Sequence, residues 1–158
     1  MPIMNLKHAP SIPSWRTWAR AALIGAAFAA SAACAQPAAN DTLYRQLGGQ
    51  PGLVALMDDF KARLLADPRM NPFFKDTDQA HLKQQLVAQF CEVSGGPCHR
   101  QGKDMKKVHA GVDITKADFN ALVEVLQHSM DAQGIAFGAQ NRLLARLAPM
   151  HREIINAP

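Results

Sequence analysis

The chain has 158 residues, a length that suits one domain with a single modest core. Its formal charge is +4, but the excess is local, because Lys7, Arg16 and Arg20 all precede the first acidic residue, Asp41. Without residues 1–35, the 17 Lys and Arg fall to 14, against 13 Asp and Glu. A nearly neutral body gives no electrostatic reason to bind DNA or RNA, so no nucleic-acid partner is expected.

Residues 1–35 have the features of a secretory leader. A cationic stretch is followed by the apolar, alanine-rich "AALIGAAFAASAA", and Ala33-Cys34-Ala35 fits the small-x-small pattern of a cleavage site. We therefore expect cleavage before Gln36 and a periplasmic or otherwise exported protein. In a second interpretation Cys34 is the lipidated first residue of a membrane-anchored lipoprotein, although Ser31 stands where such signals usually have a larger apolar residue. An uncleaved anchor fits less well, since the apolar core is short.

Residues 36–42 are expected to be a linker, and residues 43–156 to form one domain. Cleavage leaves Cys91 and Cys98, seven residues apart around a Gly-Gly-Pro turn. An even pair of cysteines in an oxidising compartment predicts a disulfide. Two alternatives stay open: free buried thiols, and a zinc site that adds His99, although this spacing matches no standard zinc pattern.

Everything after residue 40 has helical periodicity, without the sustained alternation that indicates a strand. A short helix is expected after 40–42, and Gly48-Gly49 should end it. A second begins near Pro51, and "ADPRMNPFF" ends it with two prolines. Its apolar residues recur at helical spacing: Leu53, Leu56, Met57, Phe60 and Leu64. Thr77 or Asp78 should cap a third helix. The apolar face of that helix comprises Leu82, Leu86, Phe90 and Val93.

In the second half, Ser94 to Gly102 is expected to be a loop because of its glycines and proline. A brief helix should then carry Met105, Val108, His109 and Val112. Thr115 and Asp118 form a capping-box pattern that begins a long helix ending at Gly134. The last helix is expected over 138–155, with a kink at Pro149. The sequence thus predicts an all-α single domain.

His109 shares a helical face with Met105 and Val112, so its ring is predicted to point inward. A lone inward histidine is more often a hydrogen-bonded core residue than a ligand. The adjacent Phe73 and Phe74 could supply apolar walls. Nearby cations could meet an anionic ligand edge, or could simply be a solvated face: Arg100, Lys103, Lys106 and Lys107. One imidazole against apolar walls, with cations at the rim, is what an iron porphyrin requires.

Several stretches resemble the group I truncated haemoglobins, in the right order over roughly residues 43–155: "LYRQLGG", "DDFKARLLAD", "PFF", "GGP", "GKDMKKVHAG", "ITKADFNALV" and "LAPM". The resemblance implies a two-over-two helical sandwich around haem b, with His109 as the proximal iron ligand. It also implies further cofactor-binding residues: Phe74 stacked on the haem, Leu82 and Leu86 on the distal face, Gln85 where some relatives keep a polar or histidine ligand, and Met105 of the Met-x-x-x-His pattern. Lys61 falls where many members have a tyrosine, and Leu86 replaces a glutamine of some relatives.

This resemblance implies reversible binding of dioxygen, carbon monoxide and nitric oxide. Gln85 would be the one evident short-range polar partner, while Lys61 is expected to extend its ammonium into water. We therefore expect weak distal stabilisation and fast dioxygen loss. Nitric-oxide dioxygenase or weak peroxidase activity would need an electron donor, for which the sequence has no reductase, flavin or nicotinamide motif. The alternative function is a haem-free exported helical interaction module held by a Cys91–Cys98 disulfide.

Overall fold

The computed structural model describes residues 42–158, so the expected leader and nearly all of the expected linker lie outside the described residues. The described part is helical and contains no strand. Its elements are α1 (Thr42–Gln46), α2 (Gly49–Ala66), α3 (Asn71–Phe74), α4 (Gln79–Ser94), α5 (Met105–His109), α6 (Lys116–Ala132), α7 (Phe137–Leu147), the 3-10 helix η1 (Ala148–Met150) and α8 (His151–Ile154). No helix in 42–158 is both long and apolar enough to span a bilayer.

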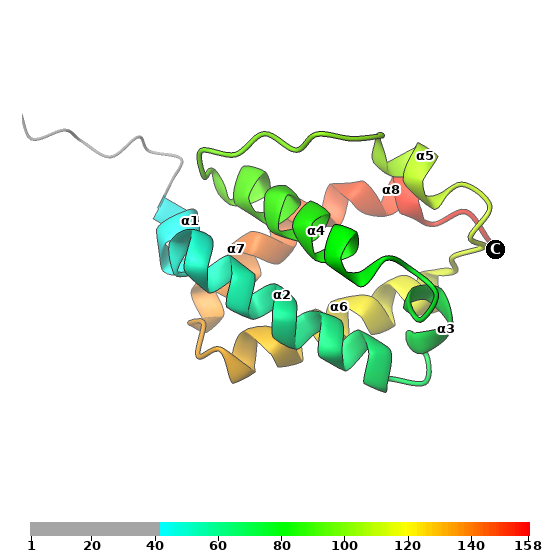
Figure 1. Cartoon of the computed structure of the whole chain (residues 1–158), viewed down its shortest axis with the longest axis horizontal. Coiled ribbons are helices and arrows are strands. Elements are labelled where there is room, and N and C mark those ends of the chain that lie inside the picture. The colour runs from blue at the N-terminus through cyan, green and yellow to red at the C-terminus, as the bar shows by residue number, and fades with distance from the viewer. Residues whose placement is uncertain (1–41) are drawn as a thin grey trace, which may run out of the picture. The chain divides into compact units, whose positions relative to one another are not determined.

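Four long helices form two antiparallel pairs. Helices α2 and α4 pack against each other and run in opposite directions, and α6 and α7 do the same (Figure 1). The pairs join because α2 also packs on α6, and α4 on α7. The all-α, two-over-two arrangement expected from the sequence is confirmed.

The core lies along α2, whose apolar stripe is fully enclosed. Leu53, Leu56, Met57 and Leu64 each have no solvent exposure, and Phe60 has 2%. Burial of each such side chain stabilises the fold by about 1.5–3 kcal/mol. The helical spacing of these residues therefore fixes which face of α2 turns inward, and with it the placement of α4 and α6.

Two predicted helix starts are seen in atomic detail. Asp78, rather than Thr77, caps α4, because its Oδ1 accepts hydrogen bonds from the amides of Ala80 and His81, each at 3.0 Å. At α6 the capping box is complete: Thr115 Oγ1 accepts from the Asp118 amide at 3.2 Å, and Asp118 Oδ2 accepts from the Thr115 amide at 3.0 Å. The hydroxyl of Thr115 also donates to Asp118 Oδ2 at 2.6 Å and lowers the pKa of that carboxyl.

Two predicted helices have different bounds in the structure. The brief helix ends at His109 instead of continuing to Val112, because Gly111 (φ 76°) and Asp113 (φ 56°) adopt left-handed backbone that a right-handed helix excludes. Val112 is 38% exposed, so it does not share a buried inner face with His109 as expected. The single helix expected over 138–155 is instead α7, η1 and α8, and the break falls at Pro149, where a kink was predicted.

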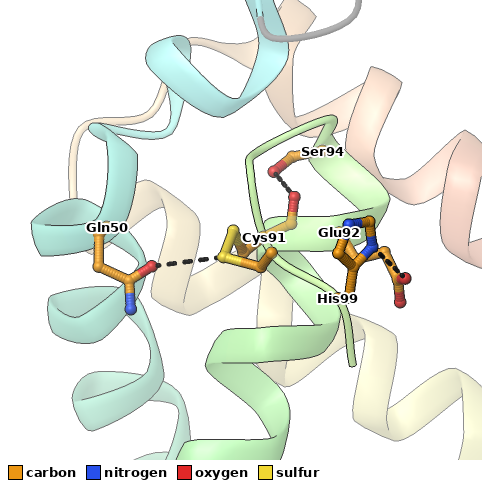
Figure 2. The surroundings of a disulfide bond; sticks show 6 residues. Gln50, Cys91, Glu92, Ser94 and His99 are labelled. Atoms are coloured by element: carbon orange, nitrogen blue, oxygen red, sulfur yellow. Dashed lines mark hydrogen bonds and ion pairs between the residues drawn. A yellow bond between two sulfur atoms is a disulfide. The ribbon is translucent and has the colours of Figure 1, made fainter. Parts of the chain in front are cut away.

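A disulfide joins α4 to the loop that follows it. Cys91 is fully buried near the end of α4 and is bonded to Cys98, with their Cα atoms 5.7 Å apart (Figure 2). Gly96 passes between Cys91 and Tyr44 so closely that a Cβ there would lie 2.7 Å from Cys91 Sγ and from the tyrosine ring. Within 42–158 no group of three His, Cys, Asp or Glu side chains could hold a metal ion, so the zinc alternative has no support.

We expect Thr115→Ala to lower the free energy of unfolding by about 1 kcal/mol at neutral pH, since it removes the N-cap of α6. The deficit should shrink in acid. The pKa of Asp118 lies below its ordinary value of about 3.9, so its stabilising effect is complete above that pH and is lost as the pH falls through the lowered folded-state pKa. Urea denaturation at several pH values measures this difference. In an Asp118→Asn background the pH dependence of the Thr115 effect should disappear; its persistence would contradict the explanation.

Candidate functional site

An apolar hollow lies between the helix pairs and has a volume of about 430 Å³. Every helix from α2 to α8 and the loop before α5 contribute to its lining, which is mainly aliphatic and aromatic. Side chains that represent the separate walls are Phe60 of α2, Leu86 of α4, Phe119 of α6, Leu144 of α7 and His109 of α5. A cavity of this size, with few polar groups, is typical of a site for a small molecule or cofactor.

His109 is half-buried and lines this cavity from the end of α5. Its Nδ1 lies 2.8 Å from the carbonyl oxygen of Met105, one helical turn earlier. A carbonyl oxygen only accepts, so Nδ1 carries a proton, and in the neutral imidazole Nε2 then keeps the lone pair. Among the described residues no hydrogen bond occupies Nε2. A neutral imidazole with one nitrogen bonded to a carbonyl and the other free is the form that binds a metal ion.

The short helix α5 that carries His109 is capped at its start. Asp104 Oδ1 accepts from the Lys107 amide at 2.7 Å, and this hydrogen bond lowers the pKa of the Asp104 carboxyl. Met105, the first residue of α5, contributes both its side chain to the cavity lining and its carbonyl to His109. The Met-x-x-x-His spacing thus places the hydrogen-bond acceptor one turn before the imidazole.

Helix α4 supplies a second wall of the cavity. Four of its residues line the cavity from one helical face, at positions i, i+3, i+4 and i+7: Leu82, Gln85, Leu86 and Gln89. Within residues 42–158 the Gln85 side chain makes no hydrogen bond, and its Oε1 would lie 3.3 Å from a Cβ placed on Gly102, so it lies beside the loop before α5. The α4 wall is therefore apolar at Leu82 and Leu86, with an amide at each of the two glutamine positions.

Gln89 was not predicted as a site residue. It is only 8% exposed, its Oε1 is buried without a hydrogen-bond partner, and its Nε2 makes a long contact of 3.6 Å to Met150 Sδ. The signal that could have identified it is its position one turn after Gln85 on the same face of α4. A polar residue on a predicted helix is normally assigned to the solvent side, and here that rule fails.

Of the predicted cations, Arg100 alone lines the main cavity, and its Nη2 donates to the Lys103 carbonyl at 2.7 Å. Arg100 and Lys103 both line an adjoining recess of about 490 Å³ that shares Leu82 and Gln85 with the main cavity. Lys107 is exposed and pairs with Asp104 at 3.3 Å. Fewer cations therefore lie at the edge of the main cavity than the cluster in the sequence indicated.

The structure brings together most of the predicted site residues. Phe74, Met105 and His109 line the cavity, together with the α4 residues Leu82, Gln85 and Leu86. Lys61 is half-buried on α2 and is absent from the lining, although its neighbour Phe60 belongs to it. The α2 side of the cavity is therefore aromatic and aliphatic.

Comparisons with known proteins agree with this geometry. Residues 42–156 match the model of the bacterial-like globin family. The chain is 31% identical to the group 1 truncated hemoglobin GlbN of Nostoc sp. (strain MUN 8820) over 115 residues, which cover 73% of this chain and 98% of the relative. It is 32% identical to the group 1 truncated hemoglobin GlbN of Mycolicibacterium paratuberculosis over 120 residues, which cover 76% of this chain and 86% of that one.

Among solved structures, the crystal structure of the truncated hemoglobin of Tetrahymena pyriformis, in its Fe(III) form, matches with a TM-score of 0.70 and 28% identity. The match covers 72% of this chain and 97% of that one. The family match spans the entire helical domain, including α5 with its histidine. The chain therefore belongs to the bacterial-like globin family and, within it, to the group 1 truncated haemoglobins.

Proposed function

We propose that the chain binds haem b in the cavity between its helix pairs, with His109 Nε2 as the axial ligand of the iron. The observation that carries this proposal is the hydrogen bond from His109 Nδ1 to the Met105 carbonyl, at 2.8 Å. That bond fixes the tautomer and leaves Nε2 free at an apolar cavity. No other histidine of the described chain lines this cavity.

The remaining lining also suits an iron porphyrin. Phe74 and Phe119 offer aromatic surface, while the leucines of α4 and α7 offer aliphatic surface for the macrocycle. Arg100 is the cation in position to meet a carboxylate at the cavity edge. This donor set, one imidazole and one guanidinium around an apolar volume, matches the chemistry of haem.

When bound, haem supplies a ferrous iron that takes up dioxygen, carbon monoxide or nitric oxide reversibly. The chain's part is to hold the imidazole, exclude water and set the polarity beside the ligand. Leu82, Leu86 and Phe60 keep bulk water out of the distal space. We infer that reversible binding of diatomic gases is the function. Turnover of nitric oxide or peroxide would require an external electron donor.

The distal polarity that supports this proposal comes from amides. Gln85 and Gln89 are on the cavity wall, whereas Lys61 is not. A neutral amide donates a weaker hydrogen bond to a partly negative ligand than a charged group does. Weak retention of dioxygen is therefore the property that this cavity favours.

We also propose that the protein is exported, through the leader at residues 1–35, and works with Cys91 and Cys98 oxidised. The disulfide of the structure and the small-x-small pattern before Gln36 support this proposal. A membrane attachment would arise only if Cys34 were lipidated. The haem-free interaction module is less well supported, since membership of a globin family and the enclosed apolar cavity both favour a cofactor.

His109→Ala should abolish or strongly alter the Soret absorption of the haem-reconstituted protein, because the axial nitrogen is lost. Added imidazole should restore it in part by occupying the vacated space. The absorption spectra of the ferric, ferrous and carbonyl forms measure this, and His128→Ala, an exposed histidine on α6, is the matched control. An unchanged spectrum in His109→Ala, or no stoichiometric haem uptake by the parent, would refute the proposal.

Gln85→Leu and Gln89→Leu should each raise the dioxygen dissociation rate by no more than about fivefold, the worth of one neutral hydrogen bond. Lys61→Met should leave that rate unchanged, because Lys61 is absent from the cavity lining. Stopped-flow displacement of dioxygen by carbon monoxide measures the three rates. An increase of tenfold or more in Lys61→Met would show that the ammonium reaches the ligand.

The purified exported chain should begin at Gln36, and its mass should show Cys91 and Cys98 linked. Reduction, or the double variant Cys91→Ala/Cys98→Ala, should lower the free energy of unfolding by about 2–3 kcal/mol, since the bond closes a short loop. Mass spectrometry without reductant and urea denaturation test both statements. Detection of a lipid on Cys34 would support the lipoprotein interpretation instead of simple cleavage before Gln36. An unprocessed chain would contradict both interpretations.

A further inference from the structure

Asn156, two residues before the end of the chain, bridges the two ends of the segment that follows α5. Its Nδ2 donates to the carbonyl oxygen of His109 at 2.7 Å, and its Oδ1 accepts from the amide of Ile114 at 2.7 Å. Its own backbone amide donates to the Ile114 carbonyl at 3.0 Å, as does the amide of Ala157. One side chain thus holds both the last residue of α5 and the residue just before the cap of α6.

Helix α5 needs this support. It has only five residues, far fewer than a helix needs to be stable by itself in water. Its start is tied by the Asp104 cap, but the carbonyls of its last turn have no helical partners. Beyond the Asn156 bond, the His109 carbonyl receives a longer bond of 3.3 Å from Val112. Asn156 therefore satisfies a helix end that α5 cannot satisfy internally.

The segment between the two contacts is also costly to hold in place. Asp113 has a φ of 56° without being glycine, a conformation that is unfavourable for an L-residue. A strained connection of this kind persists when neighbouring groups fix both of its ends. The bonds from Asn156 to His109 and Ile114 do so from outside the segment.

The C-terminal tail itself is anchored at the same site. Helix α8 packs on α5, and the two lie side by side in Figure 1. Ile154, the last residue of α8, lines the cavity together with His109. The tail that carries Asn156 thus follows directly on a helix that packs against α5.

We propose that Asn156 is a positioning residue for His109: it fixes the backbone end of the axial histidine while the Met105 carbonyl fixes its ring. The inference rests on the proposed ligation of haem by His109. With both points held, α5 cannot unwind from its C-terminal end and the imidazole keeps one orientation. Without Asn156, the C-terminal end of α5 would fray. The imidazole of His109 would then adopt several orientations toward the iron.

Two variants separate the two hydrogen bonds. Asn156→Asp keeps an oxygen that can accept from the Ile114 amide, but it has no donor for the His109 carbonyl and places negative charge beside it. Asn156→Ala removes both bonds. Asn141→Ala, at an exposed asparagine on α7, is the matched control. The purified protein is studied without haem by hydrogen exchange of the Ile114 amide, and with haem by the iron–histidine stretching band of the ferrous form and the rate of haem loss.

We expect Asn156→Ala to accelerate exchange at Ile114 and haem loss by roughly fivefold to tenfold, and to shift or broaden the stretching band. Asn156→Asp should keep most of the Ile114 protection yet match the alanine variant in haem loss and band shape. Parental haem loss and an unshifted band in both variants would overturn the inference. An aspartate variant that behaves as the parent with haem would also overturn it, because Asn156 would then support only the loop.

Hydrogen exchange at Ile114 can be measured whether or not haem binds, so failure of the proposed function and failure of the positioning role are distinguishable. If the parent took up no haem, the proposed function would fail. Exchange of the Ile114 amide in the haem-free protein would still show whether Asn156 holds the segment between His109 and Ile114 in place. If the parent bound haem through His109 and the Asn156 variants had no effect, the positioning role alone would fail.

Discussion

The hydrogen bond between His109 Nδ1 and the Met105 carbonyl is the constraint on which the site depends. It determines which ring nitrogen is protonated and therefore which one is free to bind a metal. The bond exists because α5 places residues four apart on one face, yet α5 is too short to maintain that spacing without help. Most of the surrounding structure, from the Asp104 cap to the packing of α8, keeps this one turn of helix in place.

Helix α4 links the distal wall of the cavity to the segment that leads to the histidine. Its cavity face carries Leu86 and Gln89, and its last turn carries Cys91, whose disulfide holds the following loop. That loop contains Arg100, which lines the cavity, and then enters α5. The glycine turn after α4 packs against Cys91 and Tyr44 without room for a side chain at Gly96, so the start of this loop is fixed on α4.

Local patterns were sufficient to predict the long helices α2, α4 and α6, the capping box at Thr115 and the inward face of His109, because each depends on residues within one or two turns. Features that depend on distant groups were not predictable in this way. The end of α5 is set by left-handed backbone at Gly111 and Asp113, and it is braced by Asn156, which is 47 residues from His109. The exclusion of Lys61 from the cavity follows from the rotation of α2, which the buried stripe around Phe60 dictates.

Gln89 shows why a polar residue inside the cavity is informative. An amide oxygen buried without a partner costs about 1–3 kcal/mol, and a leucine of similar length would avoid that cost. The other buried polar residues differ from Gln89, since Ser94, Ser129 and Gln140 each make a hydrogen bond within the protein. A departure from that pattern at a cavity wall, one turn from a second amide, is where a binding protein is expected to give up stability for function. The cavity therefore differs from an unfilled part of the core, and its amides set the polarity that a bound gas would meet.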